Sequence, residues 1–154
     1  MTAVYDKLGL KFLYPENWRL TDDPDSDPPR VITLENPDGS VTWSAHVYPA
    51  VTDTGESTDS DSVLKATLAT LQESYEDLEI SPDQQELGGF SASGVEVLFY
   101  CLDFLVRAQL HIVRAKEHLL LFWTQAEDRA FEAQHIVFKA ISTSLLQSLT
   151  AIED

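Results

Sequence analysis

The chain has 154 residues, of which 44% are hydrophobic, and its 26 acidic and 10 basic side chains give a formal net charge of −16. This length predicts a single domain over residues 1–154, and the apolar content suffices for a hydrophobic core, which excludes wholesale disorder. The charge opposes binding to nucleic-acid phosphates and to anionic membranes, but it is compatible with a basic protein partner or with a solvated acidic surface that binds nothing.

The first residues of the sequence predict no signal peptide, because no basic stretch is followed by an apolar one. The longest apolar runs are also too short to span a membrane, so we expect a cytoplasmic protein. Cys101 is the only cysteine, which rules out an intramolecular disulfide. It lies in the apolar run Val97–Leu102, where a cysteine usually packs as a small hydrophobe, and we expect no catalytic thiol there.

The most informative segment is Leu10–Trp18, with the sequence LKFLYPENW. An extended strand places Phe12 and Tyr14 on one face. Pro15 cannot donate a ladder hydrogen bond and holds Tyr14 extended, so the strand is expected to end there. Trp18 follows the turn and is expected to fold back over the core. We therefore predict Tyr14, Pro15 and Trp18 as structural anchors.

A hairpin and a helix are predicted next along the chain. The extended runs Arg30–Glu35 and Val41–Tyr48 flank Asn36–Gly39, whose proline and glycine positions suit a type I turn. After a polar loop, leucines at helical spacing predict a helix from Ser62 to Tyr75, with the stripe Leu64, Leu68, Leu71 and Tyr75.

The second half of the chain predicts the centre of a sheet. A short edge strand is expected at Leu78–Gln85, interrupted by Pro82. The runs Val95–Leu102 and Leu119–Trp123 are apolar on both alternating faces, so both faces need a cover.

Between these two runs lies a further predicted strand, Leu105–Ala115, and a second helix is predicted over Asp128–Leu149. Two helices for two sheet faces predict an α+β fold, a single-domain three-layer α/β/α sandwich with a mainly antiparallel central sheet.

The sequence resembles the PsbP-like and Ran-binding Mog-type superfamily, which includes many small bacterial proteins. GLKFLYPENWRL is similar to the opening of these domains, and HIVRAKEHLLLFWTQAEDRAFEAQHIVFKAISTSLL has their closing pattern of two strands and a helix. The resemblance implies the same sandwich and a non-catalytic protein-binding role, as an adaptor, accessory subunit or chaperone-like protein. Because the matching motifs are structural, no partner-binding residue of the family is carried over to this chain.

No metal or cofactor is predicted. Asp23, Asp25 and Asp27 have calcium-loop spacing, but Pro28 and Leu34 stand where such a loop needs glycine and glutamate. The histidines also do not converge. His111 and His118 flank one hairpin roughly 13 Å apart at strand rise, His135 lies on the apolar stripe of the second helix, and His46 is isolated on its strand.

The remaining motifs favour structural roles. The segment Gly88–Gly94 opens onto a strand and not a helix, so it predicts a flexible turn and not a phosphate cradle. Arg107 is expected to contact either an acidic loop of the same molecule or an anionic group of a partner. The acidic residues Asp22, Asp23, Asp25 and Asp27 are the other candidate partner contacts.

Three functions remain open at this point. The first is the non-catalytic protein-binding module that the resemblance implies. The second is a small-ligand-binding protein or enzyme with a pocket between sheet and helix, lined by Trp43, Tyr48 or Trp123. The third is a self-associating subunit that uses an exposed sheet edge, with a homo-oligomer as the result.

Overall fold

The computed structural model describes residues 1–22 and 29–151. Within these two ranges the chain forms strands and helices in an order close to the predicted one. They are β1 (Thr2–Lys7), β2 (Leu10–Pro15), β3 (Arg19–Asp22), β4 (Arg30–Glu35), β5 (Val41–Pro49), α1 (Ser60–Ser74), β6 (Glu79–Leu87), β7 (Phe90–Cys101), β8 (Phe104–Ala115), β9 (His118–Glu127) and α2 (Asp128–Ala151).

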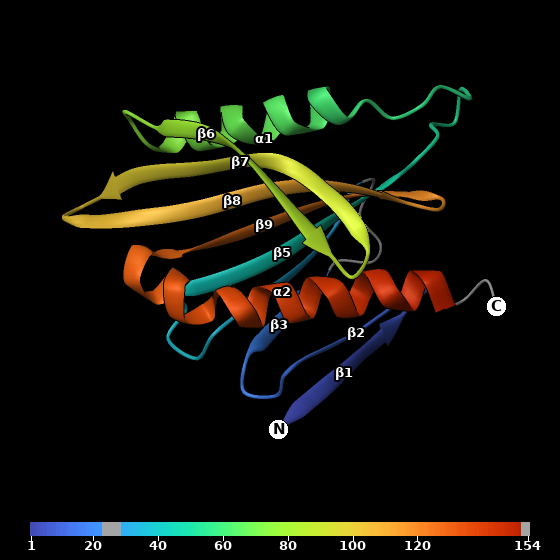
Figure 1. Cartoon of the computed structure of the whole chain (residues 1–154), viewed down its shortest axis with the longest axis horizontal. Coiled ribbons are helices and arrows are strands. Elements are labelled where there is room, and N and C mark those ends of the chain that lie inside the picture. Colours follow the sequence, from blue (N-terminus) through green and yellow to red (C-terminus); the bar gives the residue numbers. More distant parts are fainter. Residues whose placement is uncertain (23–28, 152–154) are drawn as a thin grey trace.

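The described strands form a seven-stranded antiparallel sheet in the order β3-β4-β5-β9-β8-β7-β6, and β1 and β2 form a separate hairpin. Helix α1 covers one face of the large sheet, while α2 and the β1–β2 hairpin cover the other (Figure 1). This arrangement confirms the predicted three-layer α+β sandwich. No helix in the described part of the chain is long and apolar enough to span a membrane.

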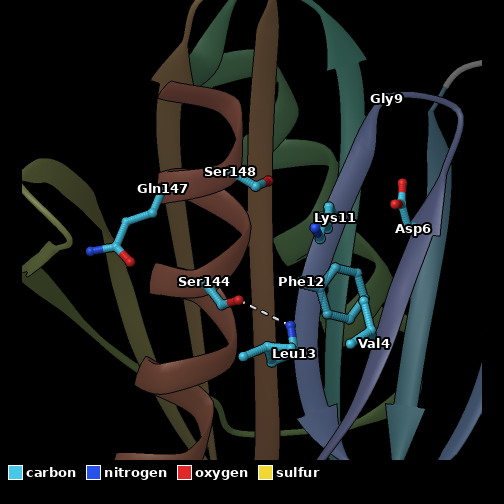
Figure 2. A pocket seen from close by; sticks show the side chains of 9 residues that line it. All are labelled: Val4, Asp6, Gly9, Lys11, Phe12, Leu13, Ser144, Gln147 and Ser148. Carbon is cyan, nitrogen blue, oxygen red and sulfur yellow. Dashed lines mark hydrogen bonds between the residues drawn. The ribbon is translucent and has the colours of Figure 1, made fainter. Parts of the chain in front are cut away.

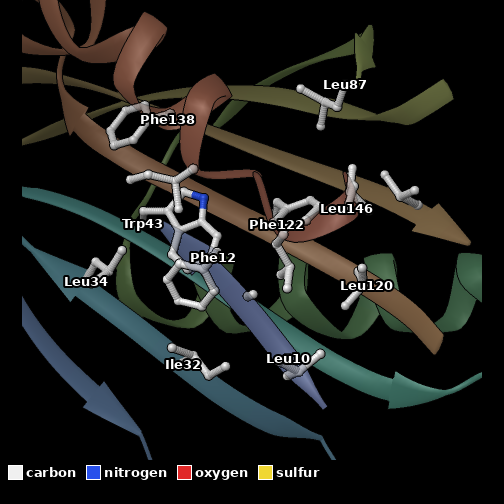
Figure 3. Close-up of a cluster of buried hydrophobic side chains, with 14 of the residues drawn as sticks. Leu10, Phe12, Ile32, Leu34, Trp43, Leu87, Leu120, Phe122, Phe138 and Leu146 are labelled. Carbon is white, nitrogen blue, oxygen red and sulfur yellow. The ribbon is translucent and has the colours of Figure 1, made fainter. Parts of the chain in front are cut away.

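The larger core lies between the sheet and α2 (Figure 3). Trp43 of β5 is fully buried there, with ring centroids 5.3 Å from Phe12 of β2 and 5.9 Å from Phe122 of β9. Its indole Nε1 donates a 2.9 Å hydrogen bond to Ser142 Oγ of α2, as a buried indole usually requires. One tryptophan therefore ties the sheet to both elements that cover this face.

The second core lies under α1, which begins at Ser60 and is capped by the Asp59 side chain. The buried positions of this helix are Val63, Thr67 and Leu71. Of the predicted stripe, Leu71 is buried, whereas Leu64, Leu68 and Tyr75 lie half-buried beside it. The side of α1 that packs against the sheet therefore contains Val63 and Thr67, each one residue before the predicted Leu64 and Leu68.

Two segments differ from the prediction. Strand β1 has no counterpart in it, because only Tyr5 of this strand is buried and the apolar alternation is correspondingly weak. The segment Gly88–Gly94 is not one flexible turn, since only Gly88 and Gly89 form the turn. Gly94 lies inside β7, where a Cβ atom would lie 1.8 Å from the backbone oxygen of Leu110. Close packing of β7 against β8 is what requires that glycine.

Strand β6 runs through Pro82 without the predicted interruption. Within the part of the chain that the structure describes, it is the last strand of the sheet and pairs only with β7. A proline is tolerated on such a strand because the side without a partner needs no N–H donor.

Candidate protein-binding surface

The hairpin between β7 and β8 ends in three large exposed apolar side chains. Tyr100 is 68% exposed, Leu102 90% and Phe104 61%. We call these three residues the apolar tip. The backbone of Leu102 has a φ of 57°, a left-handed conformation that favours glycine or asparagine over leucine. A leucine is therefore held in a costly backbone conformation, with its side chain directed to solvent.

Two shallow grooves flank the apolar tip. One, of about 460 Å³, lies between Leu102 and the end of α1, and Glu76 and Asp77 line it. The other, of about 250 Å³, lies beside Phe104 and β9, and Glu127 lines it. Neither groove has a lysine or arginine among its lining residues, and Asp103 lies in the hairpin turn itself. The apolar tip is therefore surrounded by negative charge.

The sequence did not reveal the apolar tip. The run Val95–Leu102 was expected to be a covered central strand, and Val97 and Phe99 are indeed buried. Tyr100 and Leu102 are not, because the β7–β8 hairpin extends beyond the elements that cover the sheet. The two-residue turn Leu102–Asp103 was the available signal, since apolar residues seldom occupy such a turn.

A larger groove, of about 720 Å³, lies between the β1–β2 hairpin and α2 (Figure 2). Phe12 and Leu13 form part of its wall, and the Leu13 N–H donates a 2.9 Å hydrogen bond to Ser144 Oγ of α2. Asp6 and Lys11 are opposite each other across the two strands and also line the groove. We call this feature the hairpin groove.

A buried polar cluster lies between the sheet and α2. His111 Nε2 is 2.6 Å from Asp83 Oδ2, and Gln109 bonds both Gln85 and Glu96. Burial lowers the pKa of His111, although the Asp83 carboxylate opposes this effect. The cavity beside these groups measures about 20 Å³, which is room for about one water molecule.

The histidines lie differently from the expectation in one respect. His111 and His135 of α2 line the same small cavity, a proximity that the sequence analysis did not foresee. Two elements far apart in the sequence bring them together, so no local spacing pattern could indicate it. No group of three or more potential metal ligands occurs within the residues that the structure describes.

Asp22 is held inside the molecule. Its carboxylate accepts hydrogen bonds from Tyr5 and Arg30, with Arg30 Nη2 at 3.1 Å, and its side chain is only 7% exposed. Burial would raise the pKa of Asp22, but the hydrogen bonds from Arg30 and Tyr5 outweigh it and hold that pKa below its ordinary value. Asp22 is therefore not a free surface charge. Asp23, Asp25 and Asp27 lie outside the described residues.

Arg107 is engaged within the molecule, with the first two turns of α2 and not with an acidic loop. Its guanidinium lies 2.6 Å from Asp128 and 2.8 Å from Glu132 at the start of α2, and it stacks over the Phe131 ring at 5.3 Å. Burial opposes the charged form, but the two carboxylates outweigh it and raise the pKa of Arg107. This cation joins β8 to α2.

The proposed anchors lie where the segment YPENW turns toward the core. The Trp18 N–H donates a 3.0 Å hydrogen bond to the Pro15 carbonyl oxygen, which closes the turn. The Trp18 indole is buried and packs edge-on against Phe138 of α2 at 6.4 Å. Tyr14 is half-buried and lies 6.0 Å from Phe12.

Comparison with known proteins gives likenesses of fold alone. No protein-family model matches the chain, and no curated protein matches its sequence. The solution structure of cyanobacterial PsbP (CyanoP) from Synechocystis is similar over 93% of this chain and 90% of its own, with a TM-score of 0.62 and 15% identity. A Bacteroides thetaiotaomicron protein is similar over 92% of this chain and 46% of its own, with a TM-score of 0.57 and 12% identity.

The Saccharomyces cerevisiae Ran-binding protein Mog1p is also similar over 98% of this chain and 93% of its own, with 12% identity. Its TM-score of 0.49 is too low to carry an argument about this chain. The match to CyanoP confirms the predicted PsbP-like fold. At such identities only the fold is shared, and the ligands and partners of this chain do not follow from the likeness.

Proposed function

We propose that this protein is a non-catalytic protein-binding module, an adaptor, accessory subunit or chaperone-like protein, that contacts its partner through the apolar tip. The observation that carries the proposal is the cluster of three large exposed apolar side chains on one hairpin, between two acid-lined grooves. Contiguous exposed apolar surface with a polar rim is typical of protein contact sites. A cytoplasmic location is part of the proposal, and cell fractionation checks it.

The chemistry of the apolar tip suits a basic partner. Covering a large apolar side chain contributes about 1.5–3 kcal/mol, so Leu102 and Phe104 would each add an apolar anchor to the contact. The carboxylates of Glu76, Asp77 and Glu127 would lie opposite basic side chains at the rim of that contact. Such complementarity acts mainly on the association rate and disfavours acidic competitors.

The non-catalytic reading rests on the shape of the polar sites. Trp43 packs in the core on the α2 side of the sheet, where it is fully buried and bonded to Ser142, while Tyr48 and Trp123 pack against the core under α1, so the three do not line one pocket. The cavity beside His111, a histidine whose pKa is lowered by burial, has room for about one water molecule and for no larger substrate.

The double substitution Leu102→Ser and Phe104→Ser tests the proposal. Both side chains are exposed, so the change should leave the urea midpoint nearly unaltered while removing partner capture from native lysate. The matched control is Val51→Ser with Ile136→Ser, which removes two exposed apolar side chains elsewhere. Equal capture of the same proteins by both variants would remove the apolar tip from the mechanism.

Salt dependence tests the charge of the partner. Exposed charges are screened beyond about 8 Å at physiological ionic strength, so association with a basic partner should slow as salt rises. The measurement is the on-rate of the captured partner from low to high salt. Glu76→Gln with Asp77→Asn should flatten this dependence, and an on-rate that ignores salt in the unaltered protein contradicts the basic-partner proposal.

A second candidate function, small-ligand binding, is favoured by the volume of the hairpin groove. About 720 Å³ lies within the range of small-molecule sites, and the apolar wall with a few polar groups is typical of them. A screen of amphipathic small molecules by thermal shift, repeated on Leu13→Glu, tests it. A stabilising molecule whose effect survives Leu13→Glu binds elsewhere.

A further inference from the structure

Strand β1 has an open edge. Among the described strands it pairs with β2 alone, through the two-residue turn at Leu8 and Gly9. The Leu13 N–H points away from β1 toward Ser144, so Leu13 and its cross-strand neighbour Val4 form a non-hydrogen-bonded pair. The backbone groups of Val4 therefore point away from β2, as do those of Thr2 and Asp6 by alternation.

These outward backbone groups accept or donate no hydrogen bond among the residues that the structure describes. Figure 1 shows β1 at the margin of the molecule, with β2 between it and α2. Thr2, Val4 and Asp6 are all exposed. A strand edge with unpaired N–H and C=O groups can form hydrogen bonds with a further strand.

The other described edge that is long enough for pairing carries protection that β1 lacks. Strand β6 contains Pro82 and the acidic residues Glu79, Asp83 and Glu86. Proline and repeated like charge are the usual means of preventing edge pairing. Strand β1, TAVYDK, has no proline, and its single acid and single lysine cancel.

We propose that two copies of this chain associate through antiparallel pairing of their β1 strands, around a twofold axis at Val4. In this register Val4 is opposite the partner's Val4, and Thr2 is opposite the partner's Asp6. No like charges face each other, so the pairing meets no cross-strand repulsion.

The same register extends an apolar row across both molecules. Val4 and Leu13 are direct neighbours on the exposed face, 56% and 46% exposed. Pairing places the row in the order Leu13, Val4, the partner's Val4 and the partner's Leu13. A self-complementary surface of this kind is what a twofold interface requires, because each patch has to match its own copy.

Charge distinguishes this association from the partner contact at the apolar tip. Each copy carries a net charge of −16, so two copies repel each other through the bulk of their surface while the β1 strands themselves are neutral. Added salt screens that repulsion and should strengthen the dimer. Salt should weaken the binding of a basic partner but strengthen the dimer. The two associations can therefore be distinguished, and the failure of one proposal does not affect the other.

Cross-linking tests the register. In a Cys101→Ser background, Val4→Cys places two thiols on directly opposed residues about 5.5 Å apart at Cα, within disulfide reach. Leu13→Cys is the matched control, since it is exposed on the same face but lies three strand spacings, roughly 14 Å, from its copy. Oxidation should give at least about tenfold more covalent dimer for Val4→Cys than for Leu13→Cys. Equal yields, or none, would overturn the register.

Sedimentation equilibrium on the unaltered chain tests the association itself, from micromolar to about millimolar protein. The dimer fraction should rise with concentration and with salt. Val4→Lys places like charges opposite each other, and Val4→Pro removes an N–H that the monomer does not use, so both variants should stay folded by circular dichroism and sediment as monomers. An unaltered chain that remains monomeric throughout, or a Val4→Lys variant that still dimerises, contradicts the proposal.

Discussion

Trp18 links two parts of the chain that are 120 residues apart in the sequence. Its backbone closes the turn that Pro15 begins, while its indole packs edge-on against Phe138 near the middle of α2. Edge-to-face aromatic pairs add about 0.5–1.5 kcal/mol beyond the area that they bury. The turn and the helix therefore stabilise each other through one side chain.

Replacing Trp18 by alanine should lower the free energy of unfolding by roughly 3–5 kcal/mol, because truncation of a large buried aromatic leaves a cavity. Trp18→Phe should cost less, since it keeps a ring against Phe138. Urea denaturation of both variants is the measurement. A loss below about 1 kcal/mol for Trp18→Ala would show that this residue is no architectural anchor.

Asp22 looks like the other acidic residues near it in the sequence, but the structure shows that its side chain is buried and paired with Arg30. Its carboxylate is shielded from solvent by Tyr5 and Arg30, and burial raises the pKa of the Tyr5 hydroxyl, with the Asp22 hydrogen bond adding to the effect. Asp22→Asn should therefore cost about 1.5–3 kcal/mol, the usual value of hydrogen bonds to a charged group.

The triple replacement of Asp23, Asp25 and Asp27 by asparagine should leave the free energy of unfolding nearly unchanged, if these residues are solvated as their sequence suggests. Urea denaturation compares it with Asp22→Asn. If partner binding uses this loop, the triple variant should also associate more slowly at low salt. Equal stability losses for the two variants would contradict the distinction.

The edge strands β6 and β1 differ in the residues that could prevent pairing with another strand. Strand β6 ends the large sheet with a proline and several acids, whereas β1 leaves a neutral edge open. The turn after β6 packs against α2 so closely that a Cβ at Gly88 would lie 2.9 Å from the Thr143 side chain. Helix α2 is thus fixed on one side by this turn and on the other by the Leu13–Ser144 hydrogen bond.

We predict that calcium and zinc do not bind stoichiometrically, because no group of three or more potential metal ligands occurs among the described residues. His111 Nε2 is already bonded to Asp83, and the sequence after Asp23 lacks the glycine and glutamate that a calcium-binding loop needs. Calorimetric titration of metal-free protein should show no site tighter than roughly micromolar. A saturable one-to-one isotherm with either ion would overturn this prediction.

The molecule carries its apolar exposure in a few places on an otherwise acidic surface. Tyr100, Leu102 and Phe104 gather at the end of the β7–β8 hairpin among carboxylates, while Val4 and Leu13 lie on the β1–β2 hairpin beside a lysine and an aspartate. A net charge of −16 keeps copies apart in solution at low salt. We therefore propose different partners for the two surfaces, a basic protein at one and a second copy at the other.

The stability of the whole molecule should fall in mild acid. Burial lowers the pKa of His46, which stacks on the Trp123 ring at 6.1 Å. The unfolded chain takes up a proton near pH 6.5 while the folded chain does so only at a lower pH, so the stabilisation is present above pH 6.5 and is lost as the pH falls from there through the folded-state pKa. The loss is at most about 1.4 kcal/mol per pH unit for one group.

His46→Phe isolates this contribution, because it keeps a ring against Trp123 and cannot ionise. Burial also lowers the pKa of His111, so the variant should retain part of the acid sensitivity. Urea denaturation of both proteins at pH 8 and pH 5 is the measurement. The unaltered chain should lose more free energy of unfolding than His46→Phe, and equal losses would exclude His46 as a source.

The sequence by itself determined the parts of this protein that neighbouring residues encode. Pro15 ends a strand, Asn36–Gly39 makes a turn, helical spacing gives α1 and α2, and strands apolar on both faces require two covers. These follow from backbone sterics and side-chain period, which act within a few residues.

Only the tertiary structure decided which distant side chains meet and which apolar ones stay outside. Asp22 meets Arg30 because β3 pairs with β4, and His111 of β8 meets Asp83 of β6 across the intervening strand β7. Leu102 has the apolar character of a core residue, yet it is exposed because the hairpin that carries it extends past the covering layers. Burial depends on what lies above a residue in space, and the local sequence does not contain that information.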